Sequence, residues 1–227
     1  MSDDLREFLA RARGSAATAK VIRLDELART ERDEQPWGLS ALRGRLVELS
    51  ARGASATLTT AASLVLEAQT EGEPVAWIVP WPLDGSTTPG TFYPPDAADS
   101  GIDLSALVVV RAPSVVAAGR AAERLLRSGA FGLVVIDLGS ANLEATRLSD
   151  AMLGRLVSLA QANDAAIVCL TEKTQDSTSL GSLVSLRAEA LRARASSGFE
   201  VTVRALKDKR RGPGWSRAIK ARGPSGL

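Results

Sequence analysis

The feature that most constrains the fold of this chain is a strand, a loop and a helix in direct succession at residues 44–69, GRLVELSARGASATLTTAASLVLEAQ. Residues 45–49 form a short apolar run of the kind found in buried strands, and residues 57–69 have the composition and length of a helix. The loop that joins them spans residues 50–56. Nucleotide-binding units share this layout, and in them the loop carries the phosphate-binding residues.

The phosphate-binding P-loop motif is G-x-x-x-x-G-K-[ST]. Its glycines let backbone N–H groups approach the phosphates, its lysine neutralises them, and its hydroxyl holds magnesium. Here Ala51 and Ala56 stand at the glycine positions, Thr57 at the lysine position and Leu58 at the hydroxyl position. A triphosphate in this loop would keep its charge largely uncompensated, so the sequence predicts no nucleotide cofactor and no ATP hydrolysis.

The rest of the chain alternates strand and helix patterns, which predicts an α/β fold with a mostly parallel sheet and helices on both faces. Strands are expected at 45–49, 75–79, 106–111, 133–137 and 166–170, and helices at 57–69, 114–127 and 148–161. Residues 183–195 and 199–207 have period-two runs that favour antiparallel strands at the C-terminal edge, with 215–221 as a further edge strand. The Gly- and Pro-rich loop 84–101 is expected to be irregular and mobile.

Four segments carry a resemblance to a known family. GRLVELSARGASATLTTAASLVLEAQ, GIDLSALVVV, ERLLRSGA and LVVID follow one another at 44–69, 101–110, 123–130 and 133–137. In this order they resemble RecA, the bacterial recombinase, over most of the chain, which implies a RecA-like core with a twisted sheet. Trp81 stands near the position of the family's catalytic glutamate, and Asp137 matches its magnesium-side aspartate.

RecA is known for ATP-gated filament formation on single-stranded DNA. The resemblance places its two DNA-binding loops at residues 138–147 and 171–182, and both segments are shorter here. The chain therefore resembles RecA in its frame and departs from it in the parts that hold ATP and DNA.

The N-terminal residues 1–36 form a separate arm, with a helix expected at 3–13 and a strand at 20–24. Leu5, Phe8 and Leu9 fall on one helix face, and Val21 and Ile22 belong to the strand. In RecA the corresponding arm packs on the neighbouring subunit, so the resemblance makes these residues candidates for partner binding. The alternative is that the apolar helix face folds back onto the chain's own core, residues 37–206.

The C-terminal end is basic. From residue 187 to 227 there are 11 Lys and Arg against 3 Asp and Glu, a net charge of +8, whereas the whole chain carries +2. Residues 207–227 are interpreted as a tail in which basic side chains meet phosphates and an aromatic ring stacks on a base. The candidates are Lys207, Lys209, Arg210, Arg211 and Trp215. A solvated tail without a ligand is the alternative.

Composition excludes several classes of enzyme. The chain has no histidine and one cysteine. The usual general base of hydrolytic triads and the commonest metal ligand are therefore absent, and no metal site is expected. Cys169 lies in an apolar run and is expected to be a buried small side chain. The charged N-terminus and the lack of a long apolar run favour a cytoplasmic protein without a membrane span.

These observations favour a protein that has a RecA-like core without ATPase activity and works by binding other proteins. Such sequences resemble the ImuA family, accessory proteins of damage-induced mutagenesis that work with an ImuB-type polymerase-like partner. The resemblance implies binding to RecA and to that partner, and limited RecA filament growth in favour of error-prone translesion synthesis. The alternatives are a SulA-like division inhibitor that binds FtsZ and a DNA-binding module that uses the basic tail.

Overall fold

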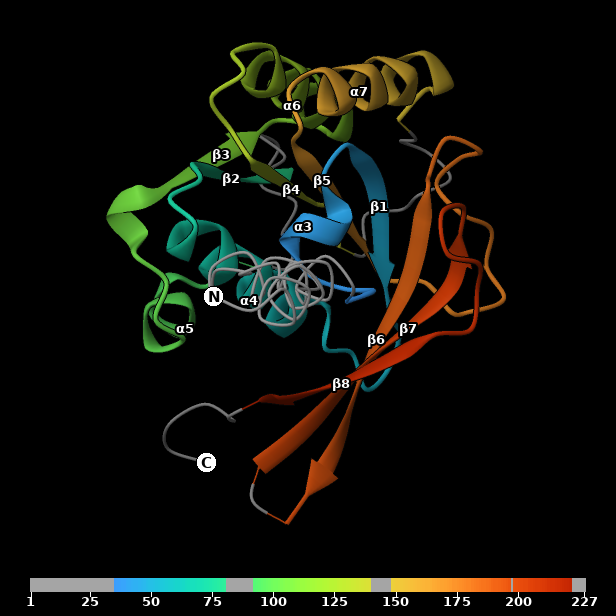
Figure 1. Cartoon of the computed structure of the whole chain (residues 1–227). Coiled ribbons are helices and arrows are strands. Elements are labelled where there is room, and N and C mark those ends of the chain that lie inside the picture. The colour runs from blue at the N-terminus through green and yellow to red at the C-terminus, as the bar shows by residue number, and fades with distance from the viewer. Residues whose placement is uncertain (1–34, 81–91, 140–147, 197, 222–227) are drawn as a thin grey trace, which may run out of the picture. The chain divides into compact units, whose positions relative to one another are not determined.

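An eight-stranded sheet runs through the residues that the computed structural model describes, 35–80, 92–139, 148–196 and 198–221 (Figure 1). Its strands are β1 (Arg45–Ser50), β2 (Val75–Pro80), β3 (Leu107–Ala112), β4 (Leu133–Asp137), β5 (Ala166–Thr171), β6 (Leu186–Ala195), β7 (Gly198–Asp208) and β8 (Ser216–Ala221). Their order is β3-β2-β4-β5-β1-β6-β7-β8. Neighbours from β3 to β6 are parallel, and β7 and β8 are antiparallel to their neighbours. This confirms the α/β class and the antiparallel C-terminal edge.

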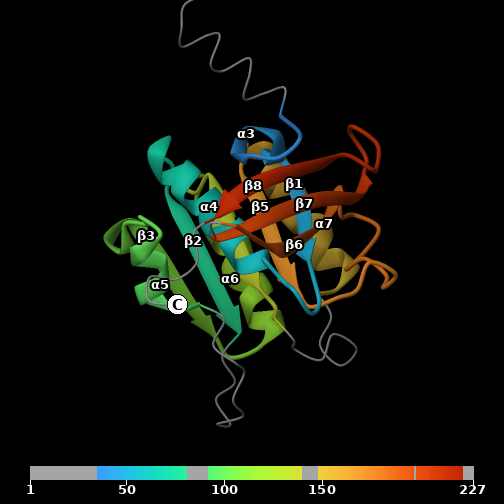
Figure 2. The same ribbon diagram turned by 90° about the horizontal axis from the view of Figure 1, so that it is seen from below.

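Helices cover both faces of the sheet (Figures 1 and 2). They are α3 (Leu39–Leu42), α4 (Thr57–Thr70), α5 (Pro94–Asp99), α6 (Val115–Arg127) and α7 (Asp150–Ala162), with a 3-10 turn η1 (Leu104–Ala106). The hydroxyls of Ser114 and Ser149 cap α6 and α7 by accepting from the amides of Ala117 and Met152. Serine at this position satisfies an otherwise unpaired amide, which fixes where each helix begins.

The core has two apolar layers because successive side chains of each central strand point to opposite faces. In β1, Val47 and Leu49 belong to the layer under α3 and α4. Leu46 belongs to the layer under α6 and α7. Strands buried on both faces are nearly continuous in apolar residues. Glu48, which is fully buried in the middle of β1, breaks this pattern.

Two expectations about local structure were wrong. Residues 94–99 of the predicted irregular loop form α5, where prolines at the start of the helix supply its φ angle in advance. The strand expected from residue 183 begins at Leu186, because the chain turns before it: the amide of Val184 bonds the carbonyl of Gly181. The short helix α3 was not predicted.

The described part of the basic C-terminal segment belongs to the sheet. β7 continues to Asp208, and β8 pairs with β7 from Ser216 to Ala221, which confirms the predicted edge strand. The charge pattern placed the start of the tail at residue 207, and β7 runs through this position without a break. None of the helices in the described ranges has both the length and the apolar character that a membrane crossing requires.

Candidate functional site

The loop at 51–56, which aligns with a P-loop, is closed by backbone hydrogen bonds to the sheet. The amide of Ala51 donates to the carbonyl of Thr171 at 3.3 Å, and the amide of Ala56 donates to the carbonyl of Ala190 at 3.0 Å. Both alanine side chains are buried. The two positions where a P-loop has glycine are therefore packed against neighbouring strands.

Two further amides, at Ser55 and Thr57, also donate to acceptors within this segment. Ser55 donates its amide to the carbonyl of Gly53 at 2.7 Å, and Thr57 donates its amide to the Ser55 hydroxyl at 3.3 Å. The carbonyl of Ala54 accepts from the amide of Arg192 in β6. A phosphate site needs backbone N–H groups that point at the ligand. Here the amides of Ala51 and of residues 55–57 already have protein acceptors.

Asp137, the residue matched to the magnesium-side aspartate, ends β4 and is buried beside Leu170 of β5. Leu58, at the hydroxyl position of the motif, is partly exposed on α4. Trp81 and most of the segment 138–147 lie outside the described residues, as do the partner-binding candidates Leu5, Phe8, Leu9, Val21 and Ile22.

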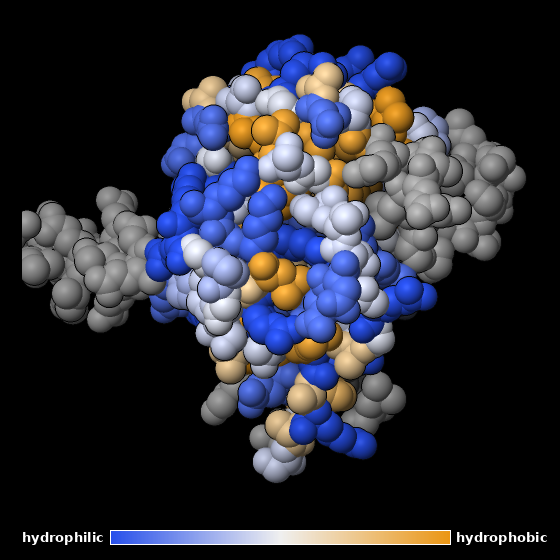
Figure 3. All heavy atoms as spheres, turned by 90° about the vertical axis from the view of Figure 1, so that its right-hand side faces the viewer, coloured by the Kyte–Doolittle hydropathy of each residue, from blue (hydrophilic) through white to orange (hydrophobic). Residues whose placement is uncertain are grey.

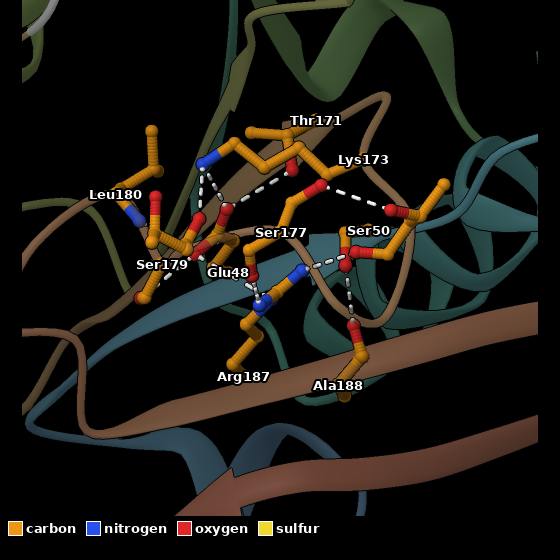
Figure 4. Close-up of polar contacts among 11 residues, drawn as sticks. Glu48, Ser50, Thr171, Lys173, Ser177, Ser179, Leu180, Arg187 and Ala188 are labelled. Carbon is orange, nitrogen blue, oxygen red and sulfur yellow. Dashed lines mark hydrogen bonds and ion pairs between the residues drawn. The ribbon is translucent and has the colours of Figure 1, made fainter.

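A buried carboxylate lies beneath the loop 172–185, which contains most of the segment 171–182 that was matched to a DNA-binding loop (Figure 4). Oε2 of Glu48 accepts from the amide of Leu180 at 2.8 Å and from the hydroxyl of Ser179 at 2.9 Å. Oε1 accepts from the hydroxyl of Thr171 at 3.2 Å and lies 2.9 Å from Nζ of Lys173. Glu48 thus holds the loop at Lys173, near its start, and at Ser179 and Leu180, near its middle.

Two cations complete this cluster. Arg187, next to Glu48 on β6, has its Nε 4.0 Å from Oε2, and its guanidinium donates to the carbonyls of Thr174 and Ser177. Lys173 donates to the carbonyl of Thr178 at 3.0 Å. The loop's polar backbone groups are therefore bound from the inside by side chains of the sheet and of the loop itself.

The Glu48 carboxylate has a full set of donors, and a carboxylate held this way is stabilised in place instead of being presented to a substrate. Cys169 lies beside it on β5, and burial, with the nearby Glu48 charge, raises the pKa of its thiol to about 12. The thiol therefore stays protonated, which confirms that Cys169 is a buried apolar side chain.

The outer surface here is polar. Figure 3 views the side of the molecule that lies on the right in Figure 1, where β6, β7 and their loops are found, and hydrophilic residues predominate in the middle of this face. Among the described residues, no group of three or more His, Cys, Asp or Glu side chains is placed to hold a metal ion.

Two of the basic candidates, Lys209 and Arg210, donate hydrogen bonds to backbone carbonyls of the protein. Lys209 donates to the carbonyl of Ser182 at 2.6 Å, and Arg210 donates to the carbonyl of Arg43 at 3.2 Å. The Lys207 pKa is lowered by burial and by the charge of Lys209. Arg211 is exposed.

Trp215 has a structural role. Its ring packs against the apolar layer under α4, and its indole N–H donates to Asp208 at 3.0 Å. Stacking of this ring on a base would have to compete with both contacts. Nucleic-acid binding by the tail stays a prediction.

The Glu48 cluster was missed in the sequence analysis, although one signal of it was present. A charged residue at the centre of an apolar strand is costly to bury without partners, so RLVELS predicts cations or amides nearby. No family model matches the chain, and no curated protein matches it.

Proposed function

We propose that this protein is a non-catalytic, RecA-like accessory protein of the DNA damage response, of the ImuA type. It binds RecA and an ImuB-type polymerase-like partner and limits RecA filament growth in favour of translesion synthesis. The observation that carries the proposal is the loop at 51–56: a strand, a loop and a helix stand in the nucleotide-binding layout, while the amides of residue 51 and of residues 55–57 donate to acceptors of the protein itself.

This loop bears on the filament because ATP acts at the contacts between RecA subunits. A subunit that joins a filament end through an N-terminal arm, but holds no ATP, offers no complete surface for the next subunit. Growth past it would stop. The internal bonds of Ala51 and Ala56 support this role, since a ligand would have to displace hydrogen bonds to β5 and β6.

The loop 172–185 supports the same role from the DNA side. Its residues up to 182 belong to the segment that resembles a DNA-binding loop of RecA, yet its carbonyls at Thr174, Ser177 and Thr178 accept from Arg187 and Lys173. Its amide at Leu180 is bound by Glu48. A loop fastened in this way has fewer groups left to contact a DNA backbone.

The decisive experiment measures RecA binding and RecA strand exchange with the full-length protein. We expect binding, and strand exchange that falls as the protein is added. The double variant Phe8→Ala, Leu9→Ala removes apolar surface from the arm, about 1.5 to 3 kcal/mol for each buried side chain, so binding should weaken on the order of a hundredfold. Its thermal midpoint should stay close to that of the wild type.

A large loss of stability in the double variant would mean that the arm packs on its own domain. Absence of RecA binding by the wild type would refute the proposal, and parallel measurements with FtsZ would test the SulA-like alternative. Calorimetry with ATP and magnesium provides a separate check: micromolar binding that Asp137→Ala abolishes would contradict a core without nucleotide.

A further inference from the structure

The edge strand β3 carries an apolar surface that the described residues leave exposed. Val108 and Val109 are 43% and 41% exposed, although they lie in a run of three valines. Three of the other exposed large apolar side chains of the described residues are in segments next to β3 in the chain, Tyr93, Leu104 and Val116, and a fourth, Leu66 on α4, lies near Gly101. The exposed apolar surface is therefore concentrated at one edge of the sheet.

In the part of the chain that the structure describes, β3 pairs only with β2, so its outer backbone edge has no partner strand there. The opposite edge strand is different. β8 carries Arg217, which donates to the carbonyl of Trp37. Charged side chains protect an edge against pairing, and β3 lacks this protection over its three valines.

The sequence of β3 is self-complementary in an antiparallel register. With Val109 opposite Val109 of a second copy, Val108 faces Val110, and Arg111 faces Leu107. Arg111, the only charged residue of β3, therefore does not face Arg111 of the second copy. An isologous contact requires this kind of self-matching surface.

We propose that two copies of this chain pair through β3, antiparallel and with Val109 on the two-fold axis, to form one continuous sheet from the two sets of eight strands. The two-fold axis is perpendicular to the sheet, so each helical layer continues across the junction. Residues around the edge, such as Leu104 and Val116, would then lose water-exposed apolar surface. This dimer is independent of RecA binding.

A cysteine at the axis tests the register directly. Antiparallel neighbours have Cα atoms about 4.5 to 5.5 Å apart, which is within the range of a disulfide. Val109→Cys should therefore give a covalent dimer on mild oxidation. Native Cys169 is buried and gives no background. The matched control is Leu58→Cys, because Leu58 has nearly the same exposure, 40%, on a different surface.

A charge at the same position tests the dimer without oxidation. Wild-type protein at about 100 µM should have the mass of a dimer by light scattering, Val109→Lys the mass of a monomer with an unchanged thermal midpoint, and Leu58→Lys the mass of a dimer. A monomeric wild type overturns the proposal, as does a dimer that survives Val109→Lys or equal cross-linking of the two cysteine variants. A monomer that Val109→Lys destabilises would show that the chain covers this edge itself, which also overturns it.

Discussion

Arg45, at the start of β1, and Asp208, at the end of β7, form an ion pair of 2.5 Å whose side chains are 1% and 0% exposed. The pair joins the parallel part of the sheet to its antiparallel edge. Asp208 also accepts from the indole of Trp215 and from the amide of Arg210, so it closes the turn between β7 and β8. Removal of either charge would leave the other buried without its partner.

Replacement of Asp208 by alanine should therefore lower the free energy of unfolding by about 3 to 5 kcal/mol, as measured by urea denaturation. Trp215→Phe, which keeps most of the ring but removes one hydrogen-bond donor to the same carboxylate, should cost only about 1 kcal/mol. Equal losses in the two variants would mean that the indole contact, and not the ion pair, holds this junction.

The same pair predicts a dependence on pH. Burial alone would raise the Asp208 pKa, but hydrogen bonds from the Arg210 amide, Trp215 and Arg45 outweigh it and hold that pKa below its ordinary value. An aspartate in an unfolded chain titrates near pH 3.9. The unfolded state therefore binds the proton first on acidification, so this stabilisation is complete above about pH 4 and is lost as the pH falls through the folded-state pKa.

We expect the free energy of unfolding to fall below about pH 4 more steeply in the wild type than in Asp208→Asn, which cannot titrate at this position. The measurement is a series of urea titrations at several pH values, and the quantity compared is the slope, because Asp208→Asn is itself less stable. Parallel slopes for the two proteins would assign the acid sensitivity to other carboxylates.

The elements of the sheet could be predicted from sequence because their signals are local: apolar runs of strand length, helical stretches and capping serines at 114 and 149. The contacts of the site could not. Glu48 meets Leu180 only because β5 and β6 flank β1, and Arg45 meets Asp208 across 163 residues of chain. Such pairs depend on strand order and register, which a local pattern does not encode.

The Glu48 cluster should control the mobility of the loop 172–185. Glu48→Gln keeps the shape of the side chain but leaves Lys173 and Arg187 without their countercharge. We expect the amide of Leu180 to exchange hydrogen at least about tenfold faster in this variant, with smaller effects in β2 and β4. Glu172→Gln, an exposed change in the same loop, is the control. Uniformly faster exchange would indicate global destabilisation.

Contact of DNA with the basic residues 209–211, between β7 and β8, can be tested without removing β8. Deletion after residue 206 would also delete Asp208 and its pair with Arg45, so point substitutions are required. Changing Lys209, Arg210 and Arg211 to serine should weaken DNA binding and reduce its salt dependence by roughly 0.7 to 0.9 per lost phosphate contact.

The control for this experiment removes three exposed positive charges from α6, by changing Arg120, Arg124 and Arg127 to serine. Equal weakening by both triple variants would mean that DNA responds only to net charge. Undiminished binding by the first variant would place the DNA contacts elsewhere on the protein.

The closure of the loop at 51–56 by backbone bonds has a consequence for sequence variation. Backbone bonds do not depend on side-chain identity, so the exposed positions 52 and 54 can accept many different side chains during evolution. Ala51 and Ala56 are confined to small residues by the strands packed around them, and Gly53 by its φ of 81°. Among descendants of this chain, small residues at positions 51 and 56 would therefore persist for reasons of packing.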